Sequence, residues 1–149
     1  MNLLLHGTNN KDIMMRPIPI EVGMLRFELE RNKSGFKLLH PSFNLFLEKR
    51  GGERASILHA KKRPFNKTAN YVISVDVKSK RKDGACLGKL RSNKIRDRYY
   101  LYNDGENPKH LSKVHISSIR NEHLGVAYNY IPCSIGKLRK VKITMPVIN

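Results

Sequence analysis

The 149-residue sequence contains no tryptophan, two cysteines and 12 acidic residues. Cys86 and Cys133 are too far apart to resemble a metal-ligand pair, and we expect Cys86 to be a small buried residue rather than a nucleophile. No 18 apolar residues run together, which argues against a membrane-spanning helix. The early apolar run at residues 3–5 is too short for a secretion signal, so the sequence predicts reduced thiols and a cytoplasmic location.

Basic residues are abundant, with 29 lysines and arginines giving a net charge of +17. The length corresponds to one domain or part of one, and the 40% hydrophobic content is sufficient for a folded core. The excess positive charge predicts an anionic partner, which is nucleic acid, a phosphoinositide-bearing membrane or an acidic protein.

Apolar residues alternate with polar ones along most of the chain, as Leu25, Phe27 and Leu29 illustrate. A period of two is typical of half-buried strands. Turn dipeptides such as Asp83-Gly84 and Asp104-Gly105 separate these runs, which favours an antiparallel all-β fold. Strands are predicted near 24–30, 43–48, 55–62, 71–78, 86–92, 99–103, 124–130 and 140–146, and only residues 107–120 are compatible with a short helix.

Enzyme signatures are absent from the sequence, which has no phosphate-binding Gly-rich loop ending in Lys-Ser/Thr, no HExxH and no GxSxG. Asp97, Asp104 and Glu106 form a small acidic cluster, but two of them flank Gly105 and suit a turn better than acid–base chemistry. We therefore expect no enzymatic activity, no cofactor and no metal site.

Two pairs of basic residues have the spacing of a phosphate-binding site. Lys61 and Arg63 are two residues apart, as are Lys89 and Arg91, so each pair leaves one face of a strand. Arginine offers a planar fork to phosphate oxygens and lysine a mobile point charge. From spacing alone, a phosphate pocket and an ordinary solvated face both remain open.

A series of short motifs extends in a characteristic order over residues 16–149. The motifs are Arg16-Pro-Ile-Pro19, Arg31-Asn-Lys-Ser-Gly35, His40-Pro-Ser-Phe-Asn-Leu-Phe-Leu47, Lys61-Lys-Arg63, Lys67-Thr-Ala-Asn-Tyr-Val-Ile-Ser-Val-Asp76, Gly88-Lys-Leu-Arg-Ser-Asn93, Tyr102-Asn-Asp-Gly-Glu-Asn-Pro108, Leu124-Gly-Val-Ala-Tyr128 and Arg139-Lys-Val-Lys-Ile-Thr-Met-Pro-Val-Ile-Asn149. Together they resemble the carboxy-terminal domain of the Tubby family.

The resemblance implies an antiparallel β-barrel threaded by an apolar helix. The sequence stops before the segment where the family places that helix, so we expect an incomplete barrel that lacks the central helix and the last strands. Residues 1–15 are expected to be an unstructured leader, and residues 16–149 a partial Tubby-like domain.

The resemblance also implies a non-enzymatic module that binds phosphatidylinositol 4,5-bisphosphate. By position in the family motifs, Lys61, Arg63 and Arg91 would contact the headgroup, with Lys89 as a neighbour. The implied location is cytoplasmic and peripheral to the plasma membrane, with the cilium and the nucleus as further destinations. Protein partners in signalling or ciliary trafficking are implied as well. The alternative is a basic nucleic-acid-binding protein connected with transcription, which the charge alone would support.

Overall fold

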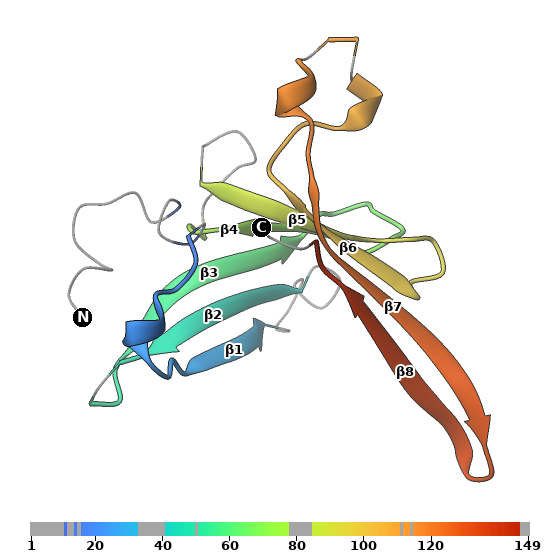
Figure 1. The fold of residues 1–149 in the computed structure, drawn as a ribbon, viewed down its shortest axis with the longest axis horizontal. Coiled ribbons are helices and arrows are strands. Elements are labelled where there is room, and N and C mark those ends of the chain that lie inside the picture. The colour runs from blue at the N-terminus through green and yellow to red at the C-terminus, as the bar shows by residue number, and fades with distance from the viewer. Residues whose placement is uncertain are drawn as a thin grey trace. The chain divides into compact units, whose positions relative to one another are not determined.

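The protein is described by a computed structural model that covers residues 11, 14, 16–32, 41–49, 51–77, 85–110, 112–113 and 115–146 (Figure 1). These residues form β1 (Phe27–Asn32), β2 (Ser42–Glu48), β3 (Arg54–Lys62), β4 (Asn70–Ser74), β5 (Cys86–Ser92), β6 (Arg98–Asn103), β7 (Glu122–Cys133) and β8 (Gly136–Thr144), with single 3-10 turns η1 (Ile20–Val22), η3 (Pro108–His110) and η4 (Ile116–Ser118). The strand order is that of the chain. The prediction of an antiparallel all-β fold is confirmed.

Two compact units make up the chain, and β4 and β5 each contribute residues to both. One unit comprises Met1–Lys62 and Val72–Leu87, and the other comprises Arg63–Tyr71 and Gly88–Asn149. We call them the first and the second unit.

In the first unit, β1, β2 and β3 pair as antiparallel neighbours. The apolar positions of β1 lie opposite apolar positions of β2, with Phe27 opposite Leu47 and Leu29 opposite Leu45. Because side chains alternate between faces, Glu28 lies on the other face, opposite Phe46. This arrangement explains why Phe46 interrupts the apolar alternation of its strand.

Phe46 is covered on this polar face by Arg54, whose guanidinium carbon lies 4.4 Å from the ring centroid. The same guanidinium donates hydrogen bonds to Glu28 at 3.0 Å and Glu30 at 2.5 Å. These two carboxylates raise the pKa of Arg54, with Glu30 contributing most.

In the second unit, β5 to β8 form a continuous antiparallel ladder with chemically distinct faces. Leu90 of β5 lies opposite Leu101, which lies opposite Leu124 of β7. Val126 continues this apolar face opposite Ile143 of β8. The opposite face carries the intervening polar residues and is described below.

Several predicted boundaries differ from the structure for local reasons. β4 ends at Ser74 rather than at residue 78, and the Ser74 hydroxyl donates to the carbonyl of Asp76 at 2.8 Å in the bend that follows. Residues 107–120 contain two 3-10 turns instead of one helix. The chain also turns tightly between Cys133 and Gly136, which extends β7 and β8 into a longer hairpin than predicted.

Some predictions fall on residues that the structure does not describe. These are the Asp83-Gly84 turn and most of the expected leader at residues 1–15. The burial of Cys86 is confirmed, since only 2% of its surface is exposed.

Candidate anion-binding face

One face of the second unit collects positive charge from three strands. On β5, Lys89 lies opposite Tyr102 and Arg91 lies opposite Tyr100. Strand pairing extends this face to Arg98 and, on β8, to two lysines opposite Ala127 and Asn129. We call this set the basic face, and it consists of Lys89, Arg91, Arg98, Lys140 and Lys142.

Arg63 and Arg91 share a face of the second unit with Asn70 between them. The Arg63 N–H donates to the Asn70 carbonyl at 2.8 Å, and the Ser92 N–H donates to the Ala69 carbonyl at 3.0 Å. In an antiparallel ladder these bonds set Arg63 opposite Asn70, and Asn70 opposite Arg91. Opposite residues point to the same side, so the two arginines flank Asn70.

Asn70 is itself a buried polar residue, with 7% of its surface exposed. Its side-chain amide donates to Asn66 Oδ1 at 3.2 Å, which ties it to the loop before β4. Since neighbouring strands are about 4.8 Å apart, the backbones at Arg63 and Arg91 are separated by about 10 Å. The two arginines therefore leave the same side of the second unit from backbone positions that lie two strands apart.

Lys89 is placed differently from the other predicted residues. Although it lies on the same face as Arg91, only 2% of its surface is exposed, and its ammonium donates to the Gly105 carbonyl at 3.3 Å. A buried ammonium requires such partners because desolvating a charge is costly. The structure therefore gives Lys89 a role in holding the loop at Gly105.

Lys61 belongs to the first unit, where it lies exposed opposite Ser42. Two residues earlier on the same strand face, the His59 Nδ1 lies 2.8 Å from Asn44 Oδ1 and its Nε2 lies 3.2 Å from the Ser56 hydroxyl. Burial lowers the pKa of His59, and the charge of Asp76 partly opposes this shift. His59, Asn44 and Ser56 thus form a small polar cluster next to Lys61, with His59 and Ser56 on the same strand as Lys61.

Arg120 adds a cation beside the basic face from outside the strands. Its guanidinium carbon lies 4.5 Å from the ring centroid of Tyr102. Burial raises the pKa of Tyr102, and Glu122 raises it further, while Arg120 and Arg91 oppose the shift. The phenol therefore stays protonated at neutral pH and can donate a hydrogen bond.

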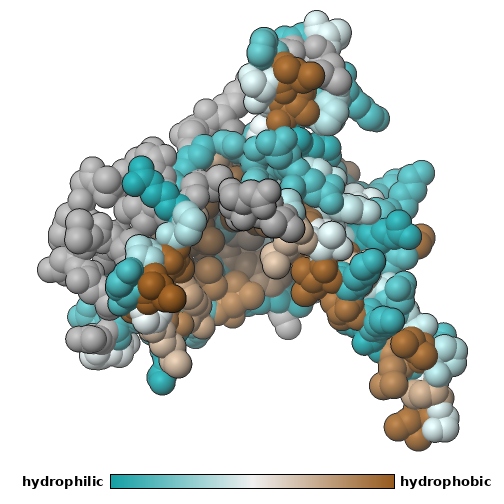
Figure 2. All heavy atoms as spheres, in the orientation of Figure 1, coloured by the Kyte–Doolittle hydropathy of each residue, from teal (hydrophilic) through white to brown (hydrophobic). Residues whose placement is uncertain are grey.

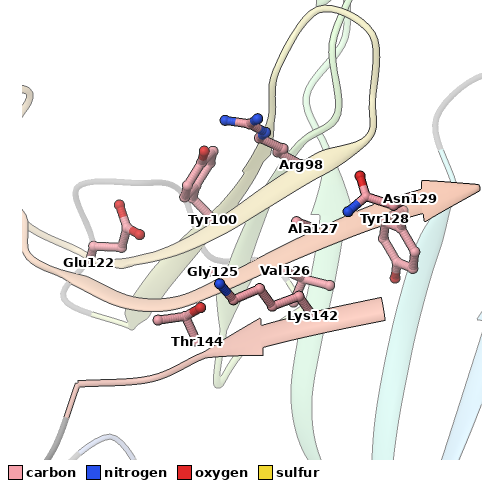
Figure 3. A pocket seen from close by; sticks show the side chains of 10 residues that line it. All are labelled: Arg98, Tyr100, Glu122, Gly125, Val126, Ala127, Tyr128, Asn129, Lys142 and Thr144. Carbon is pink, nitrogen blue, oxygen red and sulfur yellow. The ribbon is translucent and has the colours of Figure 1, made fainter. Parts of the chain in front are cut away.

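A shallow cavity of about 410 Å³ lies on the same side of the second unit (Figure 3). Figure 3 shows Arg98, Tyr100 and Glu122 along one side and Lys142 with Thr144 along the other, whereas Tyr128 points away. The lining thus combines two cations, one carboxylate and hydroxyl groups. Such a lining suits a polar ligand.

The sequence alone did not identify Arg98, Lys142 or Asn70 as residues of this face. Lys142 lies between Val141 and Ile143, so its parity alone would have placed it on the polar face of its strand. Arg98 precedes the run Tyr99-Tyr100-Leu101-Tyr102, which does not alternate and gives no such signal. Asn70 offered no such signal, because its position between two arginines depends on strand pairing.

Within the described part of the chain, no group of three or more histidine, cysteine or acidic side chains is arranged to hold a metal ion. Among the same residues, no helix is both long enough and apolar enough to span a membrane.

These features define an antiparallel β-domain with a strongly cationic surface. The sequence matches the Tub family over residues 14–149, and the chain belongs to this family. It is 30% identical over 138 residues to human Tubby-related protein 1, covering 91% of this chain and 25% of that protein. It is 32% identical over 148 residues to human Tubby-related protein 3, covering 97% of this chain and 33% of the relative.

A nematode relative, Tubby protein homolog 1 of Caenorhabditis briggsae, is 34% identical over 131 residues, which cover 84% of this chain and 30% of the relative. The chain therefore spans between a quarter and a third of the length of these relatives.

Proposed function

We propose that this Tubby-like domain docks reversibly on membranes by binding phosphoinositide headgroups, with phosphatidylinositol 4,5-bisphosphate as the preferred ligand. The proposed contacts are Lys61, Arg63 and Arg91, and no covalent chemistry is involved. Such a module would act at the cytoplasmic side of the plasma membrane as an adaptor in signalling or ciliary trafficking.

The observation that carries this proposal is the arrangement of Arg63 and Arg91 on either side of Asn70. Two guanidiniums facing the same way can each form charge-assisted, bidentate hydrogen bonds with a phosphate. A headgroup with two ring phosphates can engage both at once, whereas phosphatidylserine offers a single phosphate and a carboxylate. The pair therefore favours a polyphosphorylated headgroup over a generally anionic surface.

The other cations of the basic face, Arg98, Lys140 and Lys142, add long-range attraction toward an anionic leaflet, worth about 1 kcal/mol for each cation near the surface. Lys89 is buried, so we propose that it stabilises the loop at Gly105 and supports Arg91 indirectly.

The test is sedimentation with vesicles of matched surface charge that contain either phosphatidylinositol 4,5-bisphosphate or phosphatidylserine. Lys61→Ala with Arg63→Ala should abolish the preference for the phosphoinositide, and Arg91→Ala should do the same. Losing two charge-assisted bonds at about 1.5–3 kcal/mol each weakens specific binding by about a hundredfold or more.

The matched control is Lys109→Ala with Lys113→Ala, which removes the same charge from two exposed positions. This control should retain the preference, because it leaves Arg63 and Arg91 intact. Equal preference in the wild type and in the Lys61/Arg63 variant would contradict the proposed site.

Nucleic-acid binding is the competing function, and the net charge of +17 favours it. Soluble inositol phosphates distinguish the two functions, because they should displace the domain from phosphoinositide vesicles by occupying the same contacts. A nucleic-acid binder would instead bind duplex DNA with an affinity that falls steeply as salt increases.

A further inference from the structure

The β7–β8 hairpin extends well beyond the rest of the sheet in the second unit. Strand pairing between β6 and β7 ends at Arg98 opposite Ala127, followed by one hydrogen bond from the Tyr128 N–H to the Asp97 carbonyl at 2.7 Å. Pairing between β7 and β8 continues to Cys133 opposite Gly136. Residues 129–140 therefore form a two-stranded projection (Figure 1). All of them except Cys133 are exposed.

Large apolar side chains gather at the end of this projection. Ile135 in the turn is 95% exposed, and Leu138 is 60% exposed opposite Ile131. Tyr130 lies one residue further back and is also exposed. Figure 2 shows apolar side chains grouped at the end of the hairpin. Exposed apolar clusters of this kind mark interaction surfaces.

Positive charge follows immediately behind this apolar end. Lys137, Arg139, Lys140 and Lys142 all lie on β8, and no acidic residue occurs from His123 to Asn149. An apolar end backed by cations alone complements an anionic lipid leaflet, whose hydrocarbon boundary lies beneath a layer of phosphates. An acidic protein surface would satisfy the cations but not the apolar end.

We propose that the hairpin end, residues 130–138, inserts into the interfacial layer of an anionic lipid leaflet. This inference extends the membrane docking proposed above, but it does not require the headgroup contacts of Arg63 and Arg91. The insertion adds an apolar anchor that phosphate binding alone does not provide.

The dimensions of the hairpin suit such an insertion. A strand rises about 3.4 Å per residue, so Arg139 and Lys140 lie roughly 13–17 Å behind Ile135 along the hairpin. Interfacial segments bury their apolar groups to a depth of about 5–10 Å. Ile135 can therefore reach the acyl boundary while Arg139 and Lys140 remain at the level of the phosphates. Lys137 is nearer the end and can extend its ammonium back toward them.

The backbone of the hairpin also tolerates partial removal from water. Residues 129–133 pair with residues 136–140, so many of the backbone polar groups are bonded within the hairpin. Pro132 has no N–H to satisfy. Tyr130 can remain at the headgroup layer, where tyrosine is favoured because its ring is apolar and its hydroxyl is polar.

The absence of tryptophan from the chain makes insertion directly measurable. Ile135→Trp introduces a single fluorophore at the hairpin end, and phosphatidylcholine–phosphatidylserine vesicles carrying brominated lipids quench a fluorophore that enters the acyl boundary. We expect blue-shifted, quenched emission. The control is Ile116→Trp in η4, which is 74% exposed and lies away from the hairpin end within the same unit (Figure 1). Its emission should be unquenched.

Binding affinity gives a second readout. Ile135→Asp should weaken binding to the same vesicles by about tenfold, because the burial of one isoleucine is lost. Ile116→Asp changes the net charge equally and should reduce binding by less than about threefold. Both positions are exposed, so neither substitution should disturb the fold.

The outcomes separate this inference from the proposed headgroup site. The hairpin inference would be overturned if the Ile135→Trp variant bound phosphoinositide vesicles without quenching and Ile135→Asp left binding unchanged. The headgroup proposal would still stand in that case. Quenching on vesicles that lack phosphoinositide supports insertion even if the Lys61/Arg63 variant retains its lipid preference. Failure to bind either type of vesicle would overturn both.

Discussion

Gly105 occupies a position where any side chain would collide with backbone. A Cβ atom at this residue would lie 2.5 Å from Arg120 Cα, 2.6 Å from Arg120 N and 2.9 Å from Ile119 C. None of these atoms can rotate away as the end of a side chain would. Gly105→Ala therefore has to separate the loop at residues 104–106 from residues 118–120.

That separation would disrupt the bonds that join the two segments. The Glu106 N–H donates to the Ser118 carbonyl at 2.8 Å, and the Arg120 N–H donates to the Glu106 carbonyl at 3.0 Å. Two hydrogen bonds contribute about 1–3 kcal/mol, and residual overpacking costs a further 1–3 kcal/mol or so. Alanine also restricts the unfolded chain more than glycine does, which offsets about 0.4–1 kcal/mol of this destabilisation. We expect a net destabilisation of about 2–4 kcal/mol, which lowers the melting temperature by roughly 5–15 °C.

Gly125→Ala is the matched control. The measurement is the melting temperature of each of the two glycine variants in thermal unfolding. The nearest atom to a Cβ at Gly125 is the side-chain oxygen Oε1 of Glu122, at 3.5 Å, which is ordinary contact with a flexible group. This variant should be as stable as the wild type, or slightly more stable, because the unfolded chain loses freedom. Equal melting temperatures for Gly105→Ala and Gly125→Ala would refute the argument from close backbone approach.

Two further predictions concern single side chains. Burial lowers the pKa of His59 from its usual 6.5, so below about pH 6.5 the unfolded chain binds a proton that the folded chain resists. The free energy of unfolding should therefore fall as the pH is lowered from 7 to about 5. Urea titrations at several pH values should show that His59→Gln reduces this pH dependence. The same pH dependence in the variant and in the wild type would contradict the prediction. In the native protein, a thiol reagent should modify Cys133 rapidly and Cys86 slowly, because Cys86 is 2% exposed. Cys133→Ser should remove the fast phase, and its persistence would show that Cys86 is accessible.

Much of the strand pattern follows from sequence alone. The alternation of Phe27 and Leu29 with glutamates predicts a half-buried strand, and β1 places those apolar residues opposite Leu47 and Leu45. The same parity predicts that Lys89 and Arg91 share a face, as their cross-strand partners Tyr102 and Tyr100 show. Period-two arguments succeed because successive side chains must point to opposite sides of a strand.

Parity could not decide how accessible each residue of such a pair would be. Lys89 and Arg91 have the same spacing signal, yet the Lys89 ammonium is buried and bonded to Gly105. The loop that covers Lys89 is distant in sequence, so only the folded chain determines which cation it covers. The grouping of Arg63 with Arg91 likewise depends on the pairing of both segments with residues 69–70.

A β-bulge at the cavity of the second unit is another feature that residue parity does not predict. Simple alternation puts Glu122 on the apolar face with Leu124 and Val126. The pairing shifts between Leu101 and Tyr102, so that Leu101 lies opposite Leu124 but Tyr102 lies opposite Glu122. The extra residue in β7 reverses the parity and brings the Glu122 carboxylate to the cationic side. The sequence thus determined the fold class, the strands and the sign of the charge, whereas tertiary pairing determined which charged groups face one another, because register is set by contacts between strands.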